Sequence, residues 1–224
     1  MYSQLLFCFS HFALISSQIP TIRYIHSKGF VHRDIKPGNI VLGSKDSENS
    51  VYIVDFGLAR RYKNHRNGAH MAFLDGKPLV GTVRYASLNT HLGIGELLFV
   101  LLNKSIHLFA KAQTRRDDIE CLAYSLLDCL RDLPWGHIKG GSPKQFEERV
   151  REKKRSWTPE RLCVGIPNAF KALLSHARQL NFDEEPDYDG LQKAFLDDLK
   201  CHGYSMNTPF DSSKADDTKG AWRL

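Results

Sequence analysis

The chain has 224 residues, of which 42% are hydrophobic and 25% are charged, and its formal net charge is +6. These proportions are those of soluble globular proteins, so they exclude global disorder and allow one domain or a domain and a half. The positive charge favours a negatively charged partner, which could be nucleic acid, a membrane surface, or an acidic or phosphorylated polypeptide. Charge alone does not choose among these three.

The five cysteines are widely spaced and include no C-x-x-C pair, so they give no support for a zinc site and favour reduced thiols in a cytosolic or nuclear protein. The apolar start, residues 5–16, is not typical of a signal peptide, because no Lys or Arg precedes Arg23. It is also shorter than the about 20 apolar residues that span a bilayer. We therefore expect a buried helix there, or residues that do not belong to the domain.

A short helix is predicted before residue 30. Ile22, Tyr24 and Ile25 continue a helical apolar pattern, which ends at the basic turn and glycine of residues 26–29. A loop rich in charged residues and turn formers is expected to follow over residues 30–39.

Two short strands are expected next, at residues 40–42 and 51–54, and the polar turn 43–50 joins them as a hairpin. The composition from residue 60 to residue 81 is polar and rich in Gly, His, Lys and Arg. Such a composition is typical of a long surface loop.

After Arg115 the chain is predicted to be helical. Apolar residues recur there at i, i+3 and i+4 spacing, which indicates a well-buried helix, and they are Ile119, Leu122, Ala123, Leu126, Leu127 and Leu130. Residues 146–154, 169–180 and 191–199 are predicted to form further amphipathic helices. The tail, residues 205–224, is rich in Ser, Asp, Lys and Thr and is expected to be disordered.

Two motifs on either side of the predicted hairpin carry the chemistry. His32–Asp34 and Asn39 have the spacing H-R-D-x-x-x-x-N, and Asp55–Gly57 is a D-F-G that directly follows the second strand. Phosphoryl transfer needs a base for the attacking hydroxyl and metal ions that neutralise the charge of the phosphates. Asp34 is the candidate base, and Asn39 and Asp55 are the candidate Mg²⁺ ligands, which the hairpin is expected to bring side by side.

Lys36, two places after Asp34, narrows the class of phosphotransferase that the two motifs indicate. A lysine at this place is typical of serine/threonine kinases, in which it neutralises the transferring phosphate. Small-molecule phosphotransferases share a related H-x-D-x-x-x-x-N loop but usually lack D-F-G, so they remain a minor alternative.

With these motifs the sequence resembles the casein kinase 1 family of serine/threonine protein kinases. The most diagnostic stretch is Gly81-Thr82-Val83-Arg84-Tyr85-Ala86-Ser87-Leu88-Asn89, which stands where most kinases have A-P-E. The other stretches that carry the likeness are residues 24–39, 55–60, 115–120, 133–135 and 180–188. The likeness runs from about residue 21 to residue 204, apart from one segment described below.

The resemblance implies a mainly helical α+β fold of the protein-kinase type, of which this chain holds the large C-terminal lobe with a small β-hairpin at the catalytic loop. It implies ATP and Mg²⁺ as cofactors, bound through Lys36, Asn39 and Asp55, with Asn39 and Asp55 as metal ligands. Asp34, Lys36 and Thr82 would form the catalytic group, in which Thr82 braces the other two. The protein substrates would be acidic or already phosphorylated.

The resemblance also implies roles for charged residues outside the catalytic loop. Arg84 would belong to a substrate anion site, because its planar guanidinium binds phosphate bidentately. A salt bridge that braces the Arg84 loop is the alternative interpretation. A lysine of the same site is expected later in the chain, where Lys139 and Lys144 both fit. Asp118 resembles the buried helix aspartate that holds the backbone of the 32–34 turn.

The sequence departs from the family pattern in two ways, and these bear on whether the chain is active. The glycine-rich loop, strand lysine and helix glutamate of the small lobe are missing before His32, so we expect a truncated kinase that is weak or inactive as written. Residues 97–112 form a largely apolar insertion. We predict that this insertion and the start of the chain come from translated intron sequence or from a misplaced translation start. The expected organisation is a non-family start at residues 1–18, a catalytic domain at 19–204, and the tail 205–224.

Three interpretations stay open. The chain is a casein kinase 1-like enzyme, a kinase-derived module that binds acidic or phosphorylated partners without catalysis, or a non-functional fragment of an incorrectly delimited gene. For the enzyme we expect a monomer in the cytoplasm or nucleus, with no nucleic-acid or membrane partner. The basic run 149–155 is expected to be a solvated helix face, with docking or nuclear import as the alternative.

Overall fold

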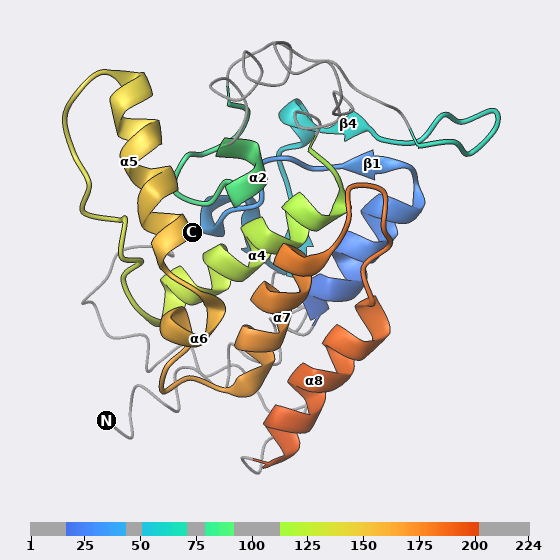
Figure 1. The fold of residues 1–224 in the computed structure, drawn as a ribbon. Coiled ribbons are helices and arrows are strands. Elements are labelled where there is room, and N and C mark those ends of the chain that lie inside the picture. The colour runs from blue at the N-terminus through green and yellow to red at the C-terminus, as the bar shows by residue number, and fades with distance from the viewer. Residues whose placement is uncertain (1–16, 44–50, 71–78, 92–112, 202–224) are drawn as a thin grey trace.

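The longest predicted helix lies at the centre of the fold. It is α4 (Arg115–Leu130), whose residues Ile119 and Leu122 are fully buried. α4 packs against α7 (Asn168–Gln179), and α7 packs in turn against α8 (Tyr188–Cys201), as Figure 1 shows. The apolar periodicity predicted for these helices is confirmed, because each turns its apolar residues toward this shared core.

The computed structural model describes residues 17–43, 51–70, 79–91 and 113–201. Four predicted features lie outside the described residues, namely the apolar start up to residue 16, the hairpin turn 44–50, the insertion 97–112 and the tail 205–224. The described parts are mainly helical with two small two-stranded sheets, which fits a kinase-like fold. The assignment of these elements to a large lobe stays a prediction.

The first described helix covers residues 17–27. Ile19, Ile22 and Ile25 lie on its inner face and are 0%, 0% and 7% exposed. Tyr24 is 63% exposed, so its assignment to the apolar face is wrong. The physical reason is that Tyr24 lies about 200° around the helix from Ile22, at about 100° per residue. The helix is followed by Gly29, whose φ of +81° is a left-handed conformation that favours glycine.

The predicted hairpin is confirmed. β2 (Ile40–Leu42) pairs antiparallel with β3 (Val51–Ile53), and Ile40 lies opposite Ile53. The second strand ends one residue before the predicted boundary. The next residue, Val54, still donates its N–H to the carbonyl of Asn39 at 2.9 Å. The pairing therefore reaches the last residue of the catalytic loop.

A second strand pair departs from the prediction. β1 (Phe30–Val31) pairs antiparallel with β4 (Arg60–Arg61), although the sequence indicates loops at both places. Strands of two residues are too short to show an alternating pattern, so no periodicity reveals them. The Arg61 guanidinium lies 4.7 Å from the centre of the Phe30 ring and covers it. This pair ties the start of the catalytic loop to the chain that follows D-F-G.

In the part of the chain that the structure describes, three further helices pack beside the core. α5 (Pro143–Ser156) contacts α2 (Leu88–His91), and α6 (Pro159–Leu162) contacts α7. The start of α5 is fixed by the reciprocal contacts of a capping box, in which Ser142 Oγ accepts from the Gln145 N–H and Gln145 Oε1 accepts from the Ser142 N–H.

The basic run 149–155 lies in α5, and the prediction that its charged residues face solvent is wrong for one of them. Among the residues of this helix, Val150 and Lys154 are buried, and Lys154 is 0% exposed. Its neighbours Lys153 and Arg155 are exposed, as predicted.

In the part of the chain that the structure describes, no helix is both long and apolar enough to cross a membrane. The described cysteines are free thiols, of which Cys121 and Cys163 are buried and Cys201 is exposed. Burial raises the pKa of the Cys121 thiol well above its ordinary value.

Candidate active site

The backbone of the catalytic loop is held by one buried carboxylate from α4. Asp118 is 0% exposed and accepts hydrogen bonds from the main-chain N–H of His32 at 2.6 Å and of Arg33 at 2.8 Å. Arg33 has a φ of +71°, which costs about 1–2 kcal/mol for a residue with a Cβ. The two hydrogen bonds to Asp118 offset this cost, and the predicted contact between Asp118 and the 32–34 turn is confirmed.

Asp118 is itself oriented by a histidine that the sequence prediction misses. His26 donates from Nε2–H to Asp118 at 2.9 Å, and its Nδ1 is hydrogen-bonded to the Tyr188 hydroxyl at 2.6 Å. The Tyr62 hydroxyl donates to the His26 carbonyl at 2.8 Å. The sequence places His26 in a basic helix end, but the residue is 2% exposed. Only its position four residues after a buried Ile22 could have suggested burial.

The side chain of His32 joins the catalytic loop to the D-F-G segment. Its Nε2–H donates to the carbonyl of Val54 at 3.1 Å, and its Nδ1 accepts the N–H of Asp34 at 3.3 Å. The His32 ring packs edge-on against Phe56, with 5.0 Å between the ring centres. Both motifs are therefore parts of one hydrogen-bonded unit.

Asp34 is buried and accepts hydrogen bonds on both carboxylate oxygens. Oδ1 accepts from the Thr82 N–H and the Thr82 hydroxyl, each at 2.8 Å, and Oδ2 accepts from Lys36 Nζ at 2.6 Å. Burial alone would raise the pKa of Asp34, but the hydrogen bonds from Lys36 and Thr82 outweigh it and hold the pKa below its ordinary value. Asp34 is consequently an ionised acceptor at neutral pH.

Lys36 and Thr82 also contact each other. Lys36 Nζ donates to Thr82 Oγ1 at 3.2 Å, which closes a triangle with Asp34. The structure thus brings the three predicted catalytic residues together from two segments, the catalytic loop and the turn after Gly81. Their catalytic roles stay predictions.

Asn39 and Asp55 lie at adjacent ends of the hairpin. Asn39 closes the short helix η1 (Pro37–Asn39), and its Nδ2 donates to the carbonyl of Asp34 at 2.9 Å. Asp55 is exposed, has a φ of +65° and accepts the Gly57 N–H at 3.2 Å at the start of η3 (Phe56–Leu58). Because Val54 donates to the Asn39 carbonyl, Asp55 follows directly on the residue that pairs with Asn39.

These two side chains fit Mg²⁺ by their chemistry. The Asn39 amide nitrogen faces Asp34, so the amide oxygen is the atom that could bind a cation, and Asp55 supplies a carboxylate. The described residues contain no group of three or more His, Cys, Asp and Glu side chains that could hold a metal ion. Mg²⁺ in phosphoryl-transfer sites needs only one or two protein carboxylates besides substrate phosphates and water, so the pair is sufficient in kind.

Gly81 places the Thr82 turn directly on the catalytic loop. Its φ is +94°, and a Cβ at this position would lie 2.3 Å from the carbonyl oxygen of Arg33. Only glycine permits this approach, which brings Thr82 within reach of Asp34.

Gly81→Ala is therefore expected to lower the free energy of unfolding by about 2–4 kcal/mol, from the left-handed backbone and the contact with Arg33 together. Urea denaturation followed by circular dichroism measures it. Gly140→Ala is the matched control, because Gly140 has a φ of +75° but nothing within 4 Å of an added Cβ. It should lose only the conformational part, about 1–2 kcal/mol. Equal losses in the two variants would show that the Arg33 contact is unimportant.

Arg84 and Tyr85 of the same turn both bind Asp128 of α4. Arg84 Nη2 lies 2.5 Å from the Asp128 carboxylate, and the Tyr85 hydroxyl donates to it at 2.8 Å. Burial alone would lower the pKa of Arg84, but Asp128 outweighs it and raises this pKa. The Arg84–Asp128 pair is the contact that the loop-bracing interpretation requires. The Arg84 side chain remains 36% exposed, and its role in an anion site stays a prediction.

The end of the turn is anchored at the start of α4. The Ser87 hydroxyl donates to Asp117 at 2.5 Å, and Asp117 also accepts the Thr114 N–H at 2.7 Å. Burial raises the pKa of Asp117 to about 6.

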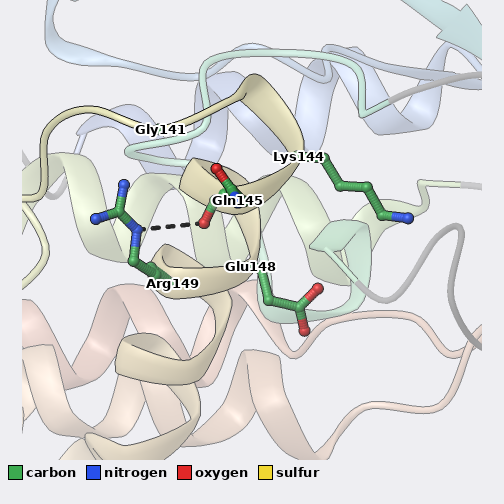
Figure 2. Close-up of a pocket in the computed structure, with 5 residues that line it drawn as sticks. All are labelled: Gly141, Lys144, Gln145, Glu148 and Arg149. Atoms are coloured by element: carbon green, nitrogen blue, oxygen red, sulfur yellow. Dashed lines mark hydrogen bonds between the residues drawn. The ribbon is translucent and has the colours of Figure 1, made fainter.

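The two lysines proposed for the anion site differ in their surroundings. Lys144 lines an open hollow at the start of α5 together with Gly141, Gln145, Glu148 and Arg149 (Figure 2). Lys139 lies just before this hollow, and its carbonyl accepts from the Arg149 guanidinium at 3.2 Å. Arg149 also donates to the Gln145 carbonyl at 3.3 Å. None of the described residues that line the hollow comes from the catalytic loop.

A comparison with known protein families bears on these residues. A family model described as the protein kinase domain matches residues 11–88, which include the catalytic loop, D-F-G and the turn that carries Thr82. The match begins inside the segment 1–18 that is expected to lie outside the domain, and the boundary at residue 19 stays a prediction. The geometry at Asp34 and this match together support a protein kinase, which is a phosphotransferase by family.

Proposed function

We propose that the chain is a serine/threonine protein kinase of the casein kinase 1 type, which transfers the γ-phosphate of ATP to hydroxyls of acidic or already phosphorylated proteins. The observation that carries the proposal is the Asp34 carboxylate, held by Lys36 and by Thr82 at 2.6–2.8 Å. A carboxylate fixed in this way can orient a hydroxyl, and a lysine beside it can neutralise charge that develops on a phosphoryl group.

The residues of this chain would divide the reaction as follows. Asp34 accepts a hydrogen bond from the attacking hydroxyl and takes its proton late, because its lowered pKa favours the ionised form. Lys36 donates to the transferring phosphoryl oxygen, and Thr82 keeps both side chains in place. Asn39 and Asp55 would hold Mg²⁺, which neutralises the charge of the ATP phosphates when bound.

The proposed preference for acidic substrates is supported by charge. The chain has a net charge of +6, and the guanidinium of Arg84 is partly exposed beside the Thr82 turn. Arg84 is already paired with Asp128, so an incoming phosphate would have to share the guanidinium with that carboxylate. A bidentate guanidinium can serve two acceptors, because it has five N–H donors.

The test uses the full chain with Mg²⁺-ATP. Because the glycine-rich loop and the strand lysine of kinases are missing before His32, we expect a rise in melting temperature with Mg²⁺-ATP but only slow transfer of radiolabelled phosphate to casein. Transfer should be faster to a serine peptide with upstream acidic residues than to the same peptide with lysines in their place. A chain that neither shifts with Mg²⁺-ATP nor labels casein overturns the proposal. A shift with a phosphopeptide but not with ATP would instead indicate a binding module.

A further inference from the structure

The turn that carries Thr82 has main-chain carbonyls that need donors from the interior. The Thr82 carbonyl is satisfied within the turn, by the N–H groups of Tyr85 and Ala86, each at 2.9 Å. The carbonyls of Val83, Arg84 and Ala86 point instead to groups outside the turn. A buried carbonyl without a donor costs about 1–3 kcal/mol, so these outside donors decide whether the turn keeps its shape.

Lys154 of α5 supplies two of these donors. Its Nζ donates to the Val83 carbonyl at 2.8 Å and to the Ala86 carbonyl at 2.6 Å. The Arg84 carbonyl between them accepts from Trp135 Nε1 at 2.8 Å. One ammonium group therefore bridges both ends of the turn, 68 and 71 positions away in the sequence.

The surroundings of Lys154 exclude contact with a substrate. The residue is 0% exposed, and Nζ lies 4.9 Å and 5.2 Å from the ring centres of Tyr124 and Trp135. Its third polar partner is His91 Nε2 at 3.1 Å. Burial lowers the pKa of Lys154 to about 7, but both the ammonium and the neutral amine carry the two N–H groups that the carbonyls require.

Burying a lysine in this way is costly, and an apolar side chain of the same shape would pack there without that cost. An apolar residue could not donate to the Val83 and Ala86 carbonyls. These two hydrogen bonds from Lys154 fix the turn whose first residue, Thr82, binds Asp34. Thr82 reaches Asp34 through its N–H and its hydroxyl, and both depend on where the turn lies.

We propose that Lys154 is a positioning residue for the catalytic carboxylate: it holds the turn 82–86 in the shape that presents Thr82 to Asp34. The effect on catalysis rests on the proposed kinase function, whereas the effect on the turn does not. Lys154 touches neither substrate nor cofactor and acts only through Thr82.

The first measurement is amide hydrogen exchange, because it does not require activity. In Lys154→Met, which keeps the length of the side chain but has no N–H, exchange of the Thr82, Tyr85 and Ala86 amides should become at least about tenfold faster. Amides of α7 should be unchanged. Lys153→Met, at the exposed neighbour on the same helix, is the matched control and should exchange like the wild type.

Unchanged exchange at these three amides in a folded Lys154→Met overturns the proposal. Lys154→Gln, which retains N–H donors on a shorter side chain, should fall between the wild type and Lys154→Met. If both substitutions unfold the chain, Lys154 is a residue of the scaffold and the positioning role is rejected.

The second measurement is kinetic. Lys154→Met is expected to lower kcat by about tenfold or more with the KM for Mg²⁺-ATP unchanged, because a displaced Thr82 misplaces Asp34 and not the nucleotide. Lys153→Met should leave both constants unchanged. A wild-type chain that transfers no phosphate overturns the proposed function, and the exchange comparison then still decides whether Lys154 holds the turn.

Discussion

Asp34→Asn is expected to lower kcat for phosphoryl transfer by about 10²–10⁴-fold without unfolding the chain. The amide keeps the size of the carboxylate, and its oxygen can still accept from the Thr82 N–H. It cannot accept a proton, and its NH₂ group would face the Lys36 ammonium, which now donates to Oδ2 at 2.6 Å. The attacking hydroxyl thus loses its base, and Lys36 loses the group that orients it.

Initial rates of radiolabel transfer measure this effect, and thermal shifts with Mg²⁺-ATP serve as the control for nucleotide binding. The shift should persist, since the predicted metal ligands Asn39 and Asp55 are untouched. Asp189→Asn is the matched substitution, because the Asp189 side chain is 74% exposed and pairs with Arg23, outside both motifs. It should leave kcat unchanged. A kcat in Asp34→Asn within threefold of the wild type would remove Asp34 from the mechanism.

The parts of the fold that could be predicted are those with a repeating pattern or a short-range signal. α4 has apolar residues at helical spacing from Ile119 to Leu130, and it lies where the pattern places it. The hairpin of β2 and β3 is indicated by two β-rich runs around a polar turn. Strands β1 and β4 have two residues each, so the alternation is never repeated in them and nothing local indicates their pairing.

The candidate site could be predicted where residue type and spacing are tied to chemistry. Asp34, Lys36 and Thr82 meet as the family resemblance implies, although Thr82 is 48 positions from Asp34. The residues behind them are not predictable in this way. His26 and Lys154 occur in charged stretches that favour solvent, and their burial depends on partners that only the folded chain brings near. The partner of His26 is Asp118, and the partners of Lys154 are two backbone carbonyls.

Asp118→Ala is expected to lower the free energy of unfolding by about 3–5 kcal/mol, the largest effect on stability that we predict. The carboxylate is fully buried and accepts from the main-chain N–H of His32 and Arg33 and from the His26 ring. Alanine leaves all three donors without this acceptor in the interior. Arg33 would then hold its φ of +71° without the hydrogen bond that stabilises it.

Urea denaturation followed by circular dichroism measures this loss, with Asp189→Ala as the control. Asp189 forms an exposed ion pair with Arg23 at 2.7 Å, and such pairs contribute about 0–1 kcal/mol. Asp118→Asn should fall between the two, because its oxygen, in the place of Oδ2, can accept from the His32 N–H and the His26 ring while its NH₂ group meets the Arg33 N–H. A loss in Asp118→Ala no greater than that in Asp189→Ala would mean that the catalytic loop keeps its shape without this carboxylate. The network from Tyr188 through His26 to the loop would then be a consequence of the loop conformation and not its cause.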